Sequence, residues 1–126
     1  MRKLTGSEKQ VNWAESLRTL FVEKLDVVLA EAKKDEIKNF AEFESYIKSA
    51  IDSIEESEWW IDRFKNMPSA LEKSSRDYYL GKGIQSTLNQ LLYLEKPEDY
   101  NLFFTWRDLP EMLGETAERL AAEGKI

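Results

Sequence analysis

SEKQVNWAESLRTLFVEKLDVVLAEAKK, residues 7–34, is the stretch that decides the fold class. Its apolar residues recur every three or four positions, which is the spacing of one face of an α-helix. The residues of this stripe are Val11, Ala14, Leu17, Phe21, Leu25 and Val28. Ser7 and Gln10 have the spacing of a capping box, in which each side chain accepts a hydrogen bond from the other residue's backbone N–H. The pattern predicts one long helix that begins near Glu8 and runs to about Lys34.

A second apolar stripe follows Asn39 and predicts a second long helix. Its residues are Phe40, Phe43, Ile47, Ala50, Ile51 and Ile54. After Ser57 the pattern changes, because bulky residues that include Trp59 and Trp60 fall on several helix faces at once. This stretch is either a buried continuation of the second helix or a separate short helix.

The pattern is less regular after residue 66. Ser69 is placed to cap a helix that ends at Gly81, and we interpret Gly81-Lys82-Gly83 as a helix stop and hinge. A further short helix then stops before Pro97, because the residue that precedes a proline avoids the α region. Its apolar residues are Ile84, Leu88, Leu91 and Leu92. The dense aromatic segment from Tyr100 to Trp106 has no structure assigned from its pattern.

The last helix has clearer boundaries. Asp108 is a capping candidate, Pro110 falls in the first turn, and Gly124 can end the helix. We therefore predict an all-α fold, a compact bundle of about five to six helices that forms a single domain over residues 1–126. Within it, residues 1–66 are a regular two-helix part and residues 67–126 a less regular, aromatic-rich part.

Composition narrows the function classes. The 126 residues carry 24 acidic and 18 basic side chains, and the net charge of −6 disfavours direct nucleic-acid binding. Histidine and cysteine are both absent, which excludes Ser-His and Cys-His nucleophile pairs and the zinc sites that use these ligands. The lack of cysteine suits a reducing compartment, and no apolar run has the length of a signal peptide core or a membrane span. These features predict a cytoplasmic protein without a membrane segment.

One acidic group is the best candidate for chemistry. The group is Glu55, Glu56, Glu58 and Asp62. Glu55 and Glu58 are spaced to share a helix face, as are Glu58 and Asp62, and carboxylates on one face can hold magnesium or manganese. An all-α nucleotide pyrophosphatase would need a second acidic pair, for which a loose match exists at Glu111, Glu115 and Glu118. The alternative interpretation is a solvated face with salt bridges. We assign no catalytic residue, cofactor or metal ligand on this basis.

Surplus aromatic residues point instead to binding. Four Trp in so short a chain predict that at least one, Trp59 or Trp106, lies on a binding surface. A basic group around Tyr78 and Tyr79 is the candidate nucleic-acid patch, and an ordinary solvated face is the alternative. Its members are Arg63, Lys65, Lys73, Arg76 and Lys82. The complete set of candidate interaction residues is Glu55, Glu58, Trp59, Asp62, Tyr78, Tyr79, Phe103 and Trp106.

Two motifs carry a resemblance to a known group of proteins. Residues 6–15, Gly-Ser-Glu-Lys-Gln-Val-Asn-Trp-Ala-Glu, and residues 59–62, Trp-Trp-Ile-Asp, resemble a two-helix module of small phage and plasmid proteins of Firmicutes. The resemblance covers the first half of the chain and implies a protein of a mobile element, located in the bacterial host cell. Such small acidic proteins include inhibitors of host defence, among them anti-CRISPR proteins. On the two helices, Trp13 is expected to meet Trp59 or Trp60.

The leading functional hypothesis is a non-enzymatic protein-interaction module that binds a host or phage protein stoichiometrically. Its sharpest form is an anti-CRISPR-like inhibitor whose partner is a Cas effector. The two alternatives are the magnesium-dependent nucleotide hydrolase that uses Glu55, Glu58 and Asp62, and a nucleic-acid accessory protein that uses Lys73, Arg76 and Lys82.

Overall fold

A computed structural model describes residues 3–94 and 97–126. These residues form seven α-helices and no β-strand, which confirms the all-α bundle, and α4 and α6 are shorter than eight residues. The helices, with a 3-10 turn η1 after the first, are α1 (Glu8–Ala32), η1 (Lys33–Asp35), α2 (Phe40–Ser53), α3 (Ser57–Phe64), α4 (Met67–Ala70), α5 (Arg76–Leu94), α6 (Tyr100–Trp106) and α7 (Leu109–Ala122).

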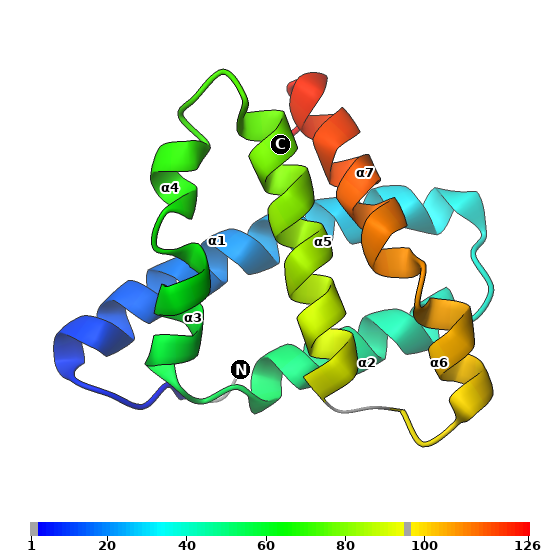
Figure 1. Cartoon of the computed structure of the whole chain (residues 1–126), viewed down its shortest axis with the longest axis horizontal. Coiled ribbons are helices and arrows are strands. Elements are labelled where there is room, and N and C mark those ends of the chain that lie inside the picture. Colours follow the sequence, from blue (N-terminus) through cyan, green and yellow to red (C-terminus); the bar gives the residue numbers. More distant parts are fainter. Residues whose placement is uncertain (1–2, 95–96) are drawn as a thin grey trace.

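The helices enclose one hydrophobic core. Helices α5 and α7 pack against each other, α7 also contacts α1, and α2 contacts α5 (Figure 1). Helix α3 packs on the first half of α1. Buried side chains from α1, α2, α3, α5, α6 and α7 join in a single cluster. Among the described residues, no helix is long and apolar enough to cross a membrane.

The first helix begins as its capping pattern predicts. Ser7 Oγ accepts a hydrogen bond from the Gln10 amide at 3.2 Å, and Gln10 Oε1 accepts one from the Ser7 amide at 3.0 Å. Both halves of the capping box are therefore present, and α1 starts at Glu8. The helix ends at Ala32, and the η1 turn that follows carries the chain to Glu36, which has a left-handed backbone conformation.

A short backbone pairing separates α2 from α3. The Thr5 amide donates to the Glu55 carbonyl at 2.7 Å, and the Ser57 amide donates to the Thr5 carbonyl at 3.2 Å. Ile54 and Glu56 are extended at this point, so the helix cannot continue through them. Of the two structures predicted for the stretch after Ser57, the separate short helix is the one observed.

The predicted stop and hinge at Gly81–Gly83 is wrong, because both glycines lie inside the continuous helix α5. A Cβ on Gly81 would lie 2.8 Å from the Gly114 carbonyl oxygen of α7 and 3.0 Å from Glu118 Cβ. Gly81 is therefore needed for the close approach of two helices and does not end one. The predicted cap at Ser69 is also wrong: α4 ends at Ala70, and the Ser69 hydroxyl donates to the Asn66 carbonyl at 3.2 Å.

The end of α5 and the start of α6 lie on either side of residues 95–96. The described part of α5 ends at Leu94, and the stop predicted before Pro97 falls on residues 95–96, which lie outside the described residues. The unassigned aromatic segment is the helix α6. Asp99 caps it, since its Oδ1 accepts hydrogen bonds from the amides of Asn101 and Leu102 at 2.9 and 3.4 Å.

The last helix agrees with its sequence signals except at the cap. Pro110 lies in the first turn of α7, and Gly124 follows the helix with a φ of 73°. Asp108 occupies the N-cap position, but its side chain makes no capping hydrogen bond.

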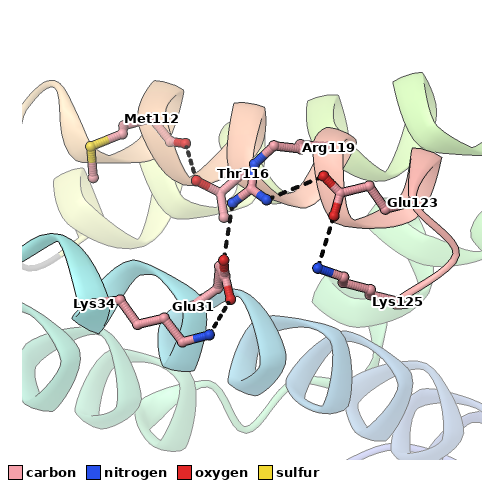
Figure 2. A network of polar contacts seen from close by, with 7 residues as sticks. All are labelled: Glu31, Lys34, Met112, Thr116, Arg119, Glu123 and Lys125. Carbon is pink, nitrogen blue, oxygen red and sulfur yellow. Dashed lines mark hydrogen bonds and ion pairs between the residues drawn. The ribbon is translucent and has the colours of Figure 1, made fainter.

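A polar network fixes α7 to α1 on the protein surface. Arg119 of α7 lies between Glu31 of α1 at 3.2 Å and Glu123 at 3.4 Å, and Glu31 also accepts from Lys34 at 3.0 Å (Figure 2). The hydrogen bonds from Lys34 and then Arg119 lower the pKa of Glu31, and the bond to Glu31 is the main reason why the pKa of Arg119 is raised. The network therefore favours the charged forms of both partners.

Candidate functional site

The predicted interaction residues do not form one site. Glu58, Trp59 and Asp62 lie on α3, Tyr78 and Tyr79 lie in the first turns of α5, and Phe103 and Trp106 lie on α6. These three groups belong to different parts of the bundle (Figure 1).

The largest group of exposed aromatic residues lies where α5 and α6 meet. We name it the α5–α6 patch, and its members are Tyr93, Leu94, Tyr100, Phe103 and Phe104. Tyr100 is 72% exposed, Tyr93 and Leu94 are half exposed, and Phe103 is half-buried. Four of the eight large hydrophobic side chains that are exposed in the described residues belong to this patch.

The rings of the patch contact one another. Phe103 lies at its centre, with its ring centroid 5.2 Å from that of Tyr93, 6.5 Å from Tyr100 and 6.2 Å from Phe104. Tyr100 and Phe104 meet edge to face at 5.0 Å, and the Arg107 guanidinium lies 5.2 Å from the Phe104 ring centroid. The four rings of the patch thus form a continuous aromatic surface, and the Arg107 guanidinium lies at its Phe104 end.

The helical period explains why α6 exposes so many rings. Leu102, Phe103 and Trp106 are spaced three or four residues apart or adjacent and pack against the core, so Tyr100 and Phe104 occupy the remaining faces. Tyr93 and Leu94 have a similar origin. They follow Leu91 and Leu92, and four consecutive apolar residues cannot all lie on the buried face of one helix.

The expectation that Trp106 lies on a binding surface is wrong. Its side chain is 2% exposed and packs in the core against Phe43 at 5.7 Å and Tyr46 at 5.5 Å between ring centroids. It is buried because it lies on the face of α6 that packs against the core. Its Nε1 has no hydrogen-bond acceptor among the described residues.

A groove runs between α2 and α6, on the other side of α6 from most of the patch. Tyr46, Leu102 and Trp106 contribute apolar surface to it. Its acidic residues are Glu42, Glu98 and Asp99, and none of the described residues that line it is basic. The surroundings of α6 therefore combine exposed rings with negative charge.

The acidic group does not form the site predicted from its spacing. Glu55 precedes α3 and lies in the extended segment that pairs with Thr5, so it does not share a helix with Glu58 and Asp62. Within residues 3–94 and 97–126, no three Asp or Glu side chains lie close enough to hold a metal ion. The expectation of one helical face was wrong because the chain leaves the helical conformation at Ile54.

Trp59 is half-buried and makes a cation–π contact with Arg63. Its ring meets that of Trp60 at 4.9 Å, and the Arg63 guanidinium carbon lies 3.9 Å from its centroid. The pKa of Arg63 is lowered. Burial is the main cause, and the nearby charge of Asp62 offsets part of the effect.

The expected contact of Trp13 with Trp59 or Trp60 is replaced by a different pair. It is Phe21 of α1 that meets Trp60, at 6.0 Å between ring centroids, and Trp13 is 47% exposed. Trp13 lies near the start of α1 and outside its buried stripe. It is an exposed tryptophan that the sequence analysis did not propose for binding.

The basic group near Tyr78 and Tyr79 is only partly assembled. Arg76 turns inward, and its Nη2 donates to the Ala121 carbonyl at 3.1 Å. The ammonium of Lys82 lies 5.9 Å from the ring centroid of Tyr78. Arg63, Lys73 and Tyr79 line one open cavity beside α4. The predicted patch is therefore smaller than its sequence suggested.

Comparison of the chain with protein-family models, with curated proteins and with solved structures found no match.

Proposed function

We propose that this chain is a protein-interaction domain that binds a partner protein through the α5–α6 patch. The observation that supports the proposal is the group of touching rings around Phe103, of which Tyr100 is 72% exposed. Contiguous apolar patches of this kind are uncommon on monomeric proteins, and aromatic side chains supply much of the binding energy of protein interfaces.

Charge defines the chemistry of the partner. Glu98 and Asp99 lie just before α6, and Glu42 lies across the groove from them. The chain itself carries a net charge of −6, which opposes association with a second copy. The partner we propose is a different protein whose apolar surface is bordered by basic side chains.

The resemblance to small proteins of mobile elements supports a sharper form of the proposal. In that form the partner is a host or phage protein, such as a Cas effector, and the chain inhibits it by stoichiometric binding. Inhibition through an occupied surface requires no catalytic residue of this chain.

A photo-crosslinking residue placed at position 104 tests the proposal. Trp13 is the matched control, because it is also 47% exposed but lies on α1. In a bacterial host lysate we expect a discrete adduct with another protein from position 104 and not from position 13. Unlabelled wild-type chain should compete for it, and a Tyr100→Ser variant should not.

Three results would contradict the proposal: the same adducts from both positions, an adduct only with a second copy of the chain, or equal competition by Tyr100→Ser. The defence-inhibitor form has a separate test. An unchanged rate of target cleavage by the host's Cas nuclease, at a molar excess of the chain, removes that form and leaves the protein-interaction domain in place.

A further inference from the structure

The cavity beside α4 is lined by two cationic side chains, Arg63 and Lys73. It is an open hollow of about 420 Å³ between the end of α3, α4 and the start of α5. Among the described residues, no Asp or Glu lines it, although acidic residues outnumber basic ones by 24 to 18 in the chain. The lining residues are Arg63, Asn66, Met67, Ser69, Ala70, Lys73 and Tyr79.

Arg63 is held in place before any ligand arrives. Its Nε donates to Gln90 Oε1, its Nη1 donates to the Trp59 carbonyl at 3.2 Å, and its guanidinium stacks on the Trp59 ring. A guanidinium has five N–H groups in a planar fork, so three remain for a ligand. Less conformational entropy is then lost on binding than for a free arginine.

The other donors of the cavity are available as well. Within the described part of the chain, Lys73 has no ion-pair partner and the Tyr79 hydroxyl no hydrogen-bond partner. Ser69 uses its hydroxyl proton on the Asn66 carbonyl, so it can only accept. A fixed guanidinium and a free ammonium that line the same cavity suit a phosphate group, which can accept hydrogen bonds from both.

The size of the ligand follows from the charge of the whole chain. A net charge of −6 repels an extended polyanion, but at physiological salt a charge is screened beyond about 8 Å. A small anion therefore responds mainly to the local cations. We propose that this cavity binds the phosphate group of a small phosphorylated ligand, with Arg63 and Lys73 as its charged contacts. This site is independent of the α5–α6 patch.

Titration of the ¹⁵N-labelled full chain by NMR at constant ionic strength tests the assignment, with inorganic phosphate and AMP as probes. We expect saturable shifts for the amides of residues 66–73 and for the indole N–H of Trp59, on which Arg63 stacks. Equal affinities would assign the site to the phosphate group alone. Tighter binding of AMP would show that the nucleoside adds contacts.

Lys73→Gln and Lys82→Gln form a matched pair of variants. Both remove one positive charge from the same region, but Lys82 lies against Tyr78 and does not line the cavity. We expect Lys73→Gln to weaken phosphate binding about tenfold, which corresponds to one lost charge-assisted hydrogen bond, and Lys82→Gln to leave it within about twofold. Both variants should keep the wild-type circular dichroism spectrum.

The proposal is overturned if the shifts do not saturate, or if the two variants weaken binding equally, because the effect is then one of overall charge. Tighter binding of a single-stranded oligonucleotide than of AMP overturns the assignment to a small ligand.

Discussion

Gly81 of α5 and Gly114 of α7 face each other with no side chain between them. A Cβ added to Gly81 would lie 2.8 Å from the Gly114 carbonyl oxygen, and one added to Gly114 would lie 2.7 Å from the Gly81 carbonyl oxygen. Both residues are buried at this crossing. The two helices can approach this closely because neither residue carries a Cβ.

We expect Gly81→Ala and Gly114→Ala each to lower the free energy of unfolding by up to about 2 kcal/mol. The overpacking penalty of about 1–3 kcal/mol exceeds the gain of about 1 kcal/mol in helix propensity, because the obstacle is backbone. Urea denaturation measures the change. Gly83→Ala is the control, since its Cβ would meet only the flexible end of Met67, and it should be neutral or slightly stabilising. A Gly81→Ala variant as stable as Gly83→Ala would contradict the close crossing.

We expect Ser7→Ala to cost about 1 kcal/mol of stability, because the Gln10 amide at the start of α1 loses its acceptor. Gln10→Ala should also destabilise, since it leaves the Ser7 amide without Gln10 Oε1. A double-mutant cycle from chemical denaturation compares the two. Purely additive effects would count against a reciprocal capping box.

The bonds of Glu31 with Lys34 and Arg119 predict a pH dependence of stability. Hydrogen bonds from Lys34 and Arg119 lower the pKa of Glu31 in the folded chain. A lowered folded pKa means that the bonds of Glu31 with Lys34 and Arg119 stabilise the fold above the unfolded pKa of about 4.3, and that this contribution is lost as the pH falls below it. Glu31→Gln should therefore lose less stability on acidification than the wild type. Thermal unfolding at pH 3 to 7 measures this.

Glu15→Gln is the control for that experiment. Glu15 is an exposed carboxylate of α1 that makes no ion pair with the described residues. If Glu15→Gln flattens the pH profile as much as Glu31→Gln does, the effect comes from overall charge and not from the bonds of Glu31 with Lys34 and Arg119.

Two tryptophans should respond in opposite ways to truncation. Trp60 is fully buried and its ring contacts Phe21 and Phe64, so Trp60→Ala should cost about 3–5 kcal/mol. Trp13 is 47% exposed, and Trp13→Ala should lie within about 0.5 kcal/mol of the wild type. Equal losses in urea denaturation would place Trp13 in the core and refute this arrangement.

The fold could be predicted wherever a local pattern decides the structure. The stripe of α1, the capping box and the stripe of α2 are local, and each is observed as predicted. The interpretation of Gly81 as a helix stop was wrong because a glycine is required there by the close approach of Gly114. Gly114 lies 33 positions later, so the sequence around Gly81 does not indicate this contact. Packing between distant segments outweighed the low helix propensity of glycine.

The candidate site was only partly accessible from the sequence for a related reason. An aromatic-rich segment predicts either a core or a surface, and only the packing of α6 decided that Trp106 is buried while Tyr100 and Phe104 are exposed. Phe103, half-buried at the centre of the patch, was the member named in advance. The run from Leu91 to Leu94 was a signal that could have located Tyr93, since a helix cannot bury four consecutive residues on one face.

The pairing of Thr5 with the segment between α2 and α3 bears on the order in which this protein assembles and opens. The hydrogen bonds between Thr5 and Glu55 join positions 50 residues apart, so they close a large loop whose entropy cost must be met before they form. We expect this backbone pairing to form after α1 has packed against α3 and to break before the bundle unfolds. The amides of Thr5 and Ser57 should then exchange with solvent earlier than those of the helices.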